Sequence, residues 1–178
     1  MRIFYDTEFV EDGVTIRLIS IGMVAEDGRE LYAVNEDTWI IRAAVQDEWL
    51  RENVVPSLPV RLVTAGAGWE WDTNHADWEA VIQRNTIAGD VEDFIQSTPD
   101  PQLWAWYGAY DHVALCQLWG RMINLPKGVP MWTNDLRQEC VRLGDPRMPE
   151  QESGEHNALA DARHVKTMAE FLDKLGVS

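Results

Sequence analysis

The sequence predicts an α/β protein built on a mixed five-stranded sheet, with three antiparallel strands followed by two parallel ones and helices on both faces. The first observation behind this prediction is a set of three strand-like apolar runs, separated by turn residues, within residues 1–34. The second is the alternation of helical and strand patterns along the rest of the chain. A length of 178 residues is typical of one domain with one sizeable core, so we expect a single domain over residues 1–178.

The first three strands are expected at about residues 2–8, 15–24 and 30–34. The last two of these are separated by Glu26-Asp27-Gly28. Asp-Gly between two apolar runs is the strongest short-range signal of a β-hairpin. We therefore expect three consecutive strands joined by hairpins.

The middle of the chain carries weaker signals. Residues 37–52 have a helical pattern, which Pro56 and Pro59 interrupt. The Gly-rich and Trp-rich stretch 66–74 is expected to be a loop or an insertion. A helix is expected over about 76–97.

The last third of the chain alternates between strands and helices. A fourth strand is expected at 103–107 and a short fifth strand at 129–132. Three helices are expected in this part: one from Tyr110 to about Met122, one capped by Asn134 or Asp135 and reaching about Leu143, and one over about 157–175.

The net charge limits the mode of any nucleic-acid binding. Thirty acidic and 15 basic residues give a formal charge of −15. Tight, non-specific binding to long nucleic acid normally depends on a broad basic surface, which this composition does not supply. Nucleic acid is still an acceptable substrate, because an enzyme that grips only a strand end needs few phosphate contacts.

Targeting signals are missing from the sequence. No apolar run approaches the roughly 20 residues of a membrane span. The N-terminus lacks the basic and apolar regions of a signal peptide. Cys116 and Cys140 form neither a CxxC pair nor a zinc spacing, so we expect free thiols. These observations predict a cytoplasmic protein without a membrane partner.

Four carboxylates occupy positions that the expected elements would bury. Asp6 and Glu8 interrupt the first strand and share one face of it, because side chains alternate along a strand. Asp111 and Asp161 each lie on the apolar stripe of a separate helix. Burying an ionised carboxylate without a partner is costly, and we expect no buried Lys or Arg from these segments. Oxygen ligands favour hard cations, so the sequence predicts that bound Mg²⁺ or Mn²⁺ neutralises these buried carboxylates.

His156 completes a set of residues suited to phosphoryl transfer. It precedes Asp161 by five positions, at or just before the first turn of the last helix. A histidine with a pKa near neutrality suits the role of general base. Two cations about 3.5–4 Å apart can hold both the attacking and the leaving oxygen of an in-line displacement at phosphorus.

These residues, in this order, resemble a known family. Asp6-x-Glu8, Asp111 after a strand, and His156-x4-Asp161 form a pattern similar to that of the DEDDh 3′–5′ exonucleases. The opening residues 1–34 look more narrowly like the actinobacterial-type polyadenylate-specific 3′-exoribonucleases. The resemblance spans roughly residues 1–35 and 100–175 and implies a ribonuclease H-like fold. The implied activity is release of nucleoside 5′-monophosphates from the 3′ end of single-stranded RNA or of a 3′ overhang.

The resemblance also implies a role for each residue of the set. Asp6, Glu8 and Asp161 would ligate one catalytic ion, and Asp6 would bridge to a second ion that Asp111 holds largely through water. His156 would be the general base.

Aromatic residues supply further candidates. Stacking on a nucleobase is expected of Phe9, Trp106 or Tyr110 near the site. Most of the 9 Trp are expected in the core or at a subunit interface, and a homodimer is compatible with this supply and with the habit of the family. The remaining histidines are expected to be structural or solvated: His75, His112 and His164.

Three alternatives stay open at this level. The same chemistry could act on DNA, because no residue identifies a contact to a 2′-hydroxyl group. A non-catalytic binding module could keep the fold and the metals. A hydrolase could use paired carboxylates without metal, as glycosidases do.

Overall fold

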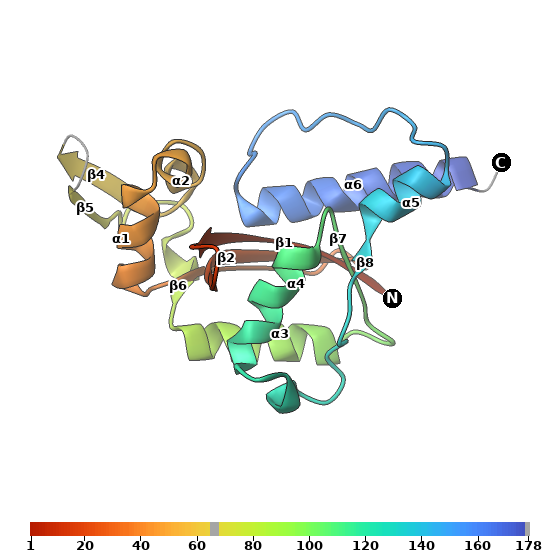
Figure 1. Ribbon diagram of the computed structural model, residues 1–178, viewed down its shortest axis with the longest axis horizontal. Coiled ribbons are helices and arrows are strands. Elements are labelled where there is room, and N and C mark those ends of the chain that lie inside the picture. Colours follow the sequence, from red (N-terminus) through yellow and green to blue (C-terminus); the bar gives the residue numbers. More distant parts are fainter. Residues whose placement is uncertain (65–67, 177–178) are drawn as a thin grey trace.

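The computed structural model describes residues 1–64 and 68–176 and has a mixed sheet between two layers of helices (Figure 1). Six strands form this sheet in the order β6-β3-β2-β1-β7-β8, and β4 and β5 form a separate two-stranded sheet. The pairs β1–β2 and β2–β3 are antiparallel, whereas β1–β7, β7–β8 and β3–β6 are parallel. The α/β class, with three antiparallel strands followed by parallel ones, is confirmed.

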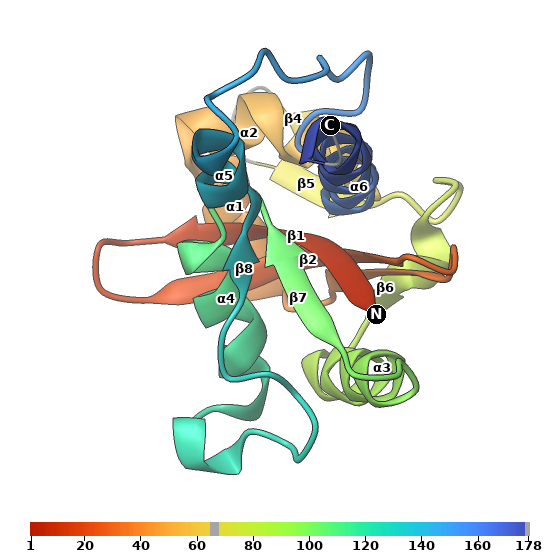
Figure 2. The same cartoon turned by 90° about the vertical axis from the view of Figure 1, so that its right-hand side faces the viewer.

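The strands have the following bounds: β1 Arg2–Glu11, β2 Ile16–Ala25, β3 Glu30–Asn35, β4 Val60–Thr64, β5 Gly68–Trp71, β6 Val81–Ile82, β7 Gln102–Ala105 and β8 Asn134–Asp135. The α-helices have these bounds: α1 Thr38–Gln46, α2 Glu48–Asn53, α3 Arg84–Gln96, α4 Ala109–Cys116, α5 Leu136–Arg142 and α6 Ala158–Gly176. Figures 1 and 2 both place α5 and α6 over one face of the sheet and α3 and α4 over the other.

β1 is the central strand, and its alternating side chains enter two different cores. Ile3 and Tyr5 pack with residues of α3 and α4. Phe4 packs on the opposite face with residues of α5 and α6. A strand covered on both faces needs apolar residues at every position, so the polar residues that follow Phe4 require a separate explanation.

Gly22 of β2 determines how closely α6 approaches the sheet. A Cβ atom at this position would lie 2.2 Å from the carbonyl oxygen of Ala158, the first residue of α6. Such a distance is far inside van der Waals contact, so only Gly permits this packing. Because Gly22 pairs with Asp6 across β1 and β2, the close approach brings the start of α6 over the carboxylates of β1.

The prediction of five strands is wrong by one. Val81–Ile82 form the additional edge strand β6, which pairs in parallel with Val34 and Asn35 of β3. These residues lie inside the helix expected over 76–97, which in fact begins at Arg84. Pairing with a strand distant in sequence overrides the local helical pattern here.

The fifth predicted strand is displaced. Residues 129–132 are not in a strand, and the pairing with β7 occurs instead at Asn134–Asp135. Asp135 also caps α5 by accepting a hydrogen bond from the backbone N–H of Arg137, as one of the two predicted caps.

Other boundaries differ because turn residues end the elements early. The helix expected over 37–52 is divided in two by Asp47, whose carboxylate caps α2. The helix that begins near Tyr110 ends at Cys116 and continues as a 3₁₀ turn over 117–119. In the stretch expected to be a loop, residues 68–71 form β5, while residues 66 and 67 lie outside the described residues.

Among the described residues, no helix combines the length and hydropathy that crossing a lipid bilayer requires. Cys116 and Cys140 are both free thiols, as predicted.

Candidate active site

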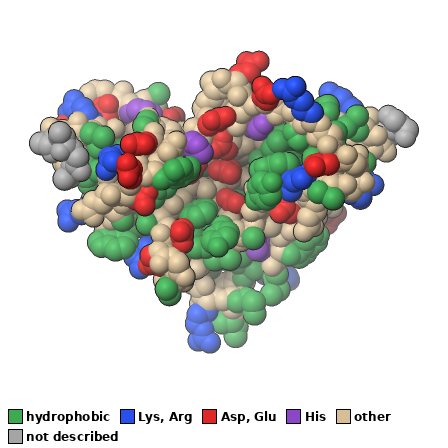
Figure 3. Space-filling view, turned by 45° about the horizontal axis from the view of Figure 1, so that its top comes forward, with side chains coloured by type: hydrophobic (Ala, Val, Ile, Leu, Met, Phe, Trp, Pro, Cys, Tyr) green, Lys and Arg blue, Asp and Glu red, His purple; other side chains and the backbone are tan. Residues whose placement is uncertain are grey.

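A cavity of about 440 Å³ opens where β1 runs past the end of β7, beside α2 and the N-terminal ends of α4 and α6. The structure brings all eight sequence-predicted site residues to the wall of this cavity: Asp6, Glu8, Phe9, Trp106, Tyr110, Asp111, His156 and Asp161. Figure 3 shows acidic side chains gathered in a hollow in the middle of one face, with histidine and hydrophobic side chains around them.

The two carboxylates of β1 project toward α6 from positions i and i+2. Glu8 is only 8% exposed, and burial raises the pKa of its carboxyl group to about 8, with further upward contributions from Asp161 and Asp111. Burial also raises the pKa of Asp6 well above its ordinary value, and repulsion from the other three carboxylates adds to this effect. Both shifts show that the site strongly disfavours uncompensated negative charge.

Asp111 enters the site from α4 and is fixed by β1. Its Oδ1 accepts hydrogen bonds from the backbone N–H of Thr7 at 2.9 Å and from the Thr7 hydroxyl group at 2.7 Å. The pairing of β7 with β1 extends only as far as Phe4, so the N–H of Thr7 is left for a side chain to satisfy. Burial raises the pKa of Asp111, although the two bonds from Thr7 oppose this shift.

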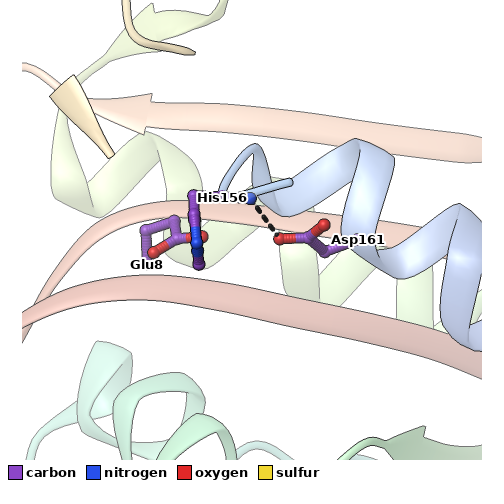
Figure 4. A group of neighbouring side chains, drawn as sticks. All are labelled: Glu8, His156 and Asp161. Carbon is purple, nitrogen blue, oxygen red and sulfur yellow. Dashed lines mark hydrogen bonds between the residues drawn. The ribbon is translucent and has the colours of Figure 1, made fainter. Parts of the chain in front are cut away.

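Asp161 enters from the first turn of α6. Its Oδ1 accepts a hydrogen bond from the side-chain amide of Gln151 at 2.7 Å, and its Oδ2 accepts one from the backbone N–H of His156 at 2.9 Å. Burial nevertheless raises the pKa of Asp161. Glu8, His156 and Asp161 each present one potential ligand atom, and these three atoms lie within 4.8 Å of one another (Figure 4).

His156 is held from the opposite wall by residues near α2. Its backbone carbonyl group accepts a hydrogen bond of 2.7 Å from the hydroxyl group of Ser57. Its ring meets the ring of Trp49 edge-on, with 5.0 Å between centroids and 77° between planes. His156 also has a φ of +63°, in the left-handed region, which is uncommon for residues other than Gly but which His adopts more often than most. Several contacts, and not a single one, therefore hold His156 at the cavity.

Among the described residues, the wall of the cavity contains no Lys or Arg. The four carboxylates with raised pKa values therefore have no Lys or Arg of the cavity wall as partner. Hard divalent cations fit this donor set, since Mg²⁺ and Mn²⁺ prefer carboxylate oxygens. The wall can also accommodate planar rings, because Phe9 and Tyr110 are stacked at 6.0 Å with 12° between their planes.

The cavity is also lined by residues that the sequence did not indicate as site residues, among them Trp49, Tyr107, Gln151 and His164. His164 was expected to be structural or solvated, but it lies three positions after Asp161 and so shares its helix face. The sequence could therefore have indicated His164 as a residue near the site, from its spacing to Asp161 alone. Trp49 carries no comparable signal, because it is distant in sequence from the other site residues. Gln151 carries none either, because it lies in the loop before α6, where no regular spacing relates it to Asp161.

Comparison with known proteins identifies close relatives. A family model described as the 3′-5′ exoribonuclease Rv2179c-like domain matches residues 1–172. Two relatives from Mycobacterium tuberculosis, the 3′-5′ exoribonuclease Rv2179c of strain H37Rv and the 3′-5′ exoribonuclease MT2234.1 of strain CDC 1551, are each 50% identical to this chain over 165 residues. Each match covers 92% of this chain and 88% of the relative.

Solved structures resemble the fold at low sequence identity. A chain from the structure of the yeast NOT1 MIF4G domain co-crystallised with CAF1 has a TM-score of 0.50 and 13% identity, with 99% of this chain and 80% of that chain covered. A structure of S. pombe Pop2p in a form with Mg²⁺ and Mn²⁺ bound gives a TM-score of 0.46 at 14% identity, with coverages of 97% and 81%. The first likeness concerns the fold alone and agrees with the ribonuclease H-like class.

Proposed function

The chain belongs to the Rv2179c-like 3′-5′ exoribonuclease family, and from this premise we propose that its cavity removes nucleotides one at a time from the 3′ end of single-stranded RNA or of a 3′ overhang. Membership makes the protein a phosphodiester hydrolase with RNA as its substrate. The non-catalytic module and the metal-free glycosidase-like hydrolase are therefore set aside. The observation that carries the mechanism is the convergence of Asp6, Glu8, Asp111 and Asp161 on one cavity.

We assign Asp6, Glu8 and Asp161 to one divalent cation, with Asp6 shared with a second cation near Asp111. The raised pKa values of these carboxyl groups support this assignment, because a bound cation offsets the repulsion that raises them. Mg²⁺ or Mn²⁺ bound here would align the attacking and leaving oxygens and stabilise the charge that develops on the phosphoryl group.

The protein's own residues would orient the water and move its proton. His156 accepts a proton from the attacking water as the new bond from its oxygen to phosphorus forms. The bond from phosphorus to the 3′ oxygen of the preceding nucleotide breaks, and this oxygen takes up a proton from solvent water. The products are a new 3′-hydroxyl end and a nucleoside 5′-monophosphate. The hydrogen bond from the N–H of His156 to Asp161 ties the position of the base to that of a metal ligand. This hydrogen bond would therefore keep the general base and the metal ligand in a fixed relative position during the reaction.

Stacking would seat the terminal bases. Phe9 and Tyr110 already form a stacked pair at the wall, and Trp106 lies on the same wall. Aromatic rings bind any base by its π-face, which is compatible with sequential removal of different nucleotides. In this proposal, residues 1–178 act as one exonuclease domain. The cytoplasmic location and the homodimer stay predictions.

The direct test is hydrolysis of RNA with a 3′ overhang in Mg²⁺ by the wild type and by Asp6→Ala and His156→Ala. Removing a general base typically costs about 10²- to 10⁴-fold in rate, and we expect losses of at least this order. Asp90→Asn, on the exposed surface of α3, is the matched control and should leave the rate unchanged. Chelation by EDTA should abolish hydrolysis.

A matched 20-mer of DNA in the same assay separates RNA from DNA specificity. Equal rates for wild type, Asp6→Ala and His156→Ala would contradict the proposed mechanism. Faster cleavage of the DNA would replace the assigned substrate with a deoxyribonucleotide strand.

A further inference from the structure

Tyr107 has a backbone conformation that bulky residues rarely adopt. Among the described residues, four that are not Gly have a positive φ: Asp100, Tyr107, Asp145 and His156. Asp tolerates the left-handed region because its short side chain can bond locally, whereas Tyr at a φ of +55° does not have this compensation. The two bulky members of the group, Tyr107 and His156, both line the catalytic cavity.

The turn that contains Tyr107 is fixed by backbone contacts. The N–H of Tyr107 donates to Oδ1 of Asp135 at 3.1 Å, and its carbonyl group accepts from the N–H of Ala109 at 2.8 Å. Gly108 follows, where an added Cβ would lie 2.7 Å from the Cβ of Ala105. These contacts involve the main chain of Tyr107, and any residue that tolerates a positive φ could make them.

The ring of Tyr107 contributes little to the core. The residue is 62% exposed, and its ring meets Trp106 edge-on at 5.2 Å with 68° between planes. A strained conformation usually persists at a position where function requires it, and it needs surroundings that hold it in place. Here the turn projects an exposed aromatic ring at the mouth of the cavity.

We infer that Tyr107 is a stacking residue for a nucleobase next to the scissile phosphate, supported from one side by Trp106. This inference rests on the proposed function and adds a binding residue to it. The electrostatics favour it, since the chain carries a formal charge of −15 and, within the described part of the chain, the cavity wall has no Lys or Arg to hold phosphates. Apart from the phosphate contact that bound cations would supply, the binding of the strand end must then rely on stacking, which does not depend on charge.

The first test compares Tyr107→Asn and Tyr107→Gly with the wild type and with Tyr107→Phe. Asn and Gly both accept a positive φ, so they remove the ring and keep the turn. Loss of one base–aromatic stack should raise KM by about 5- to 100-fold, with kcat changed much less. Tyr107→Phe should retain the wild-type KM. The melting temperatures of the Asn and Gly variants should stay within roughly 4 °C of the wild type or rise.

Trp132→Ala is the matched control, because Trp132 is also 62% exposed and does not line the cavity. Its KM should equal that of the wild type. If Tyr107→Asn and Tyr107→Gly left KM within about twofold of the wild type, the ring would have no binding role and the inference would be wrong. If both lowered the melting temperature by more than roughly 4 °C, the ring would support the fold, which would contradict the premise that main-chain contacts alone hold the turn.

The second test uses RNA that lacks one base, either at the terminal or at the penultimate nucleotide. One of these two substrates lacks the base that stacks on Tyr107. On that substrate, Tyr107→Asn should raise KM less than about twofold. On the other substrate, the same variant should raise KM by the full factor of about 5- to 100-fold. An equal penalty on intact RNA and on both abasic substrates would overturn the inference. Failure of the wild type to cleave intact RNA would instead reject the proposed function, so the two failures are distinguishable.

Discussion

Glu8 illustrates at the residue scale why the cavity requires cations. Its carboxyl group has a pKa of about 8 in the folded protein, against an ordinary value of 4.5. Each unit of such a shift corresponds to about 1.4 kcal/mol, so ionised Glu8 destabilises the metal-free fold by an amount on the order of several kcal/mol. The residue is therefore retained at a considerable cost, as is typical of a functional site.

This shift predicts how pH affects the stability of the metal-free protein. Because the folded-state pKa is the higher one, the folded protein binds the proton more tightly than the unfolded chain does. The contribution of Glu8 to stability is therefore largest at acidic pH and is lost as the pH rises from about 4.5 through about 8. In EDTA we expect a lower melting temperature at pH 9 than at pH 6, and we expect Glu8→Gln to reduce this difference. An identical pH response of wild type and Glu8→Gln would contradict the burial argument.

Ser57 is a positioning residue for His156. Its hydroxyl group donates to the carbonyl oxygen of His156, and a neutral hydrogen bond of this kind contributes about 1 kcal/mol. Ser57→Ala should therefore lower kcat by roughly 2- to 10-fold and change KM little. Ser97→Ala removes a similar bond, from a hydroxyl group to the carbonyl oxygen of Phe94, far from the cavity, and should leave kcat unchanged.

The pH profile of kcat distinguishes positioning from a general loss of stability. A displaced His156 should change the profile of Ser57→Ala on its acidic side, where the base becomes protonated. Equal kcat values and identical profiles for Ser57→Ala and Ser97→Ala would show that Ser57 does not act through His156.

At this scale the sequence indicates acidic residues that lie together at the cavity, but it does not indicate the residues that hold them in place. Asp161 and His156 could be recognised because they are near one another in the chain and on the start of a helix. Trp49 and Ser57 could not be recognised, since their contacts to His156 join residues about 100 positions apart. Five of the 9 Trp are partly buried and pack against the core clusters, and three are exposed. The expectation that most of them lie in the core or at a subunit interface is therefore met at the edges of the core, and the interface stays a prediction.

At the scale of elements, the site depends on how closely α6 approaches β2. Gly22→Ala would place a methyl group against the backbone of Ala158, and backbone cannot move as a flexible side chain can. Overpacking of this kind costs about 1–3 kcal/mol or more, and it would displace the start of α6 together with Asp161 and His156. We expect a lower free energy of unfolding in urea and a lower kcat.

Gly89→Ala is the matched control for this substitution. Gly89 lies in α3, and an added Cβ there would meet no atom within 4 Å. Replacing a Gly inside a helix by Ala should leave the protein as stable or stabilise it by up to about 1 kcal/mol. If the two variants had the same free energy of unfolding and the same kcat, the close approach at Gly22 would not control the site.

Elements with strong local patterns were predicted within a few residues, and elements defined by distant pairing were not. β1, β2 and β3 follow from alternation and from the Asp27-Gly28 turn, and α6 follows from its apolar stripe. By contrast, β6 and β8 are only two residues each and exist because a distant strand is available for pairing. No local pattern in two residues can indicate such a strand.

At the scale of the whole molecule, the charge distribution matches an enzyme that holds only the end of an RNA strand. The formal charge of −15 disfavours long-range attraction of nucleic acid. Within the described part of the chain, at least seven of the 15 basic residues form ion pairs with carboxylates, which further reduces the positive charge available to phosphates. Cations bound by the four cavity carboxylates would make the electrostatic potential favourable for a phosphate at the point where the scissile phosphate must lie.

Titration of Mn²⁺ into the metal-free protein, followed by calorimetry, tests this account most directly. Wild-type protein should bind two ions per chain, and binding should raise its melting temperature. Asp6→Asn should lose at least one of the two ions, because Asp6 is assigned to both, whereas the surface variant Asp90→Asn should bind like the wild type. Absence of Mn²⁺ binding, or equal binding by wild type and Asp6→Asn, would contradict the claim that the four carboxylates converge in order to hold divalent cations.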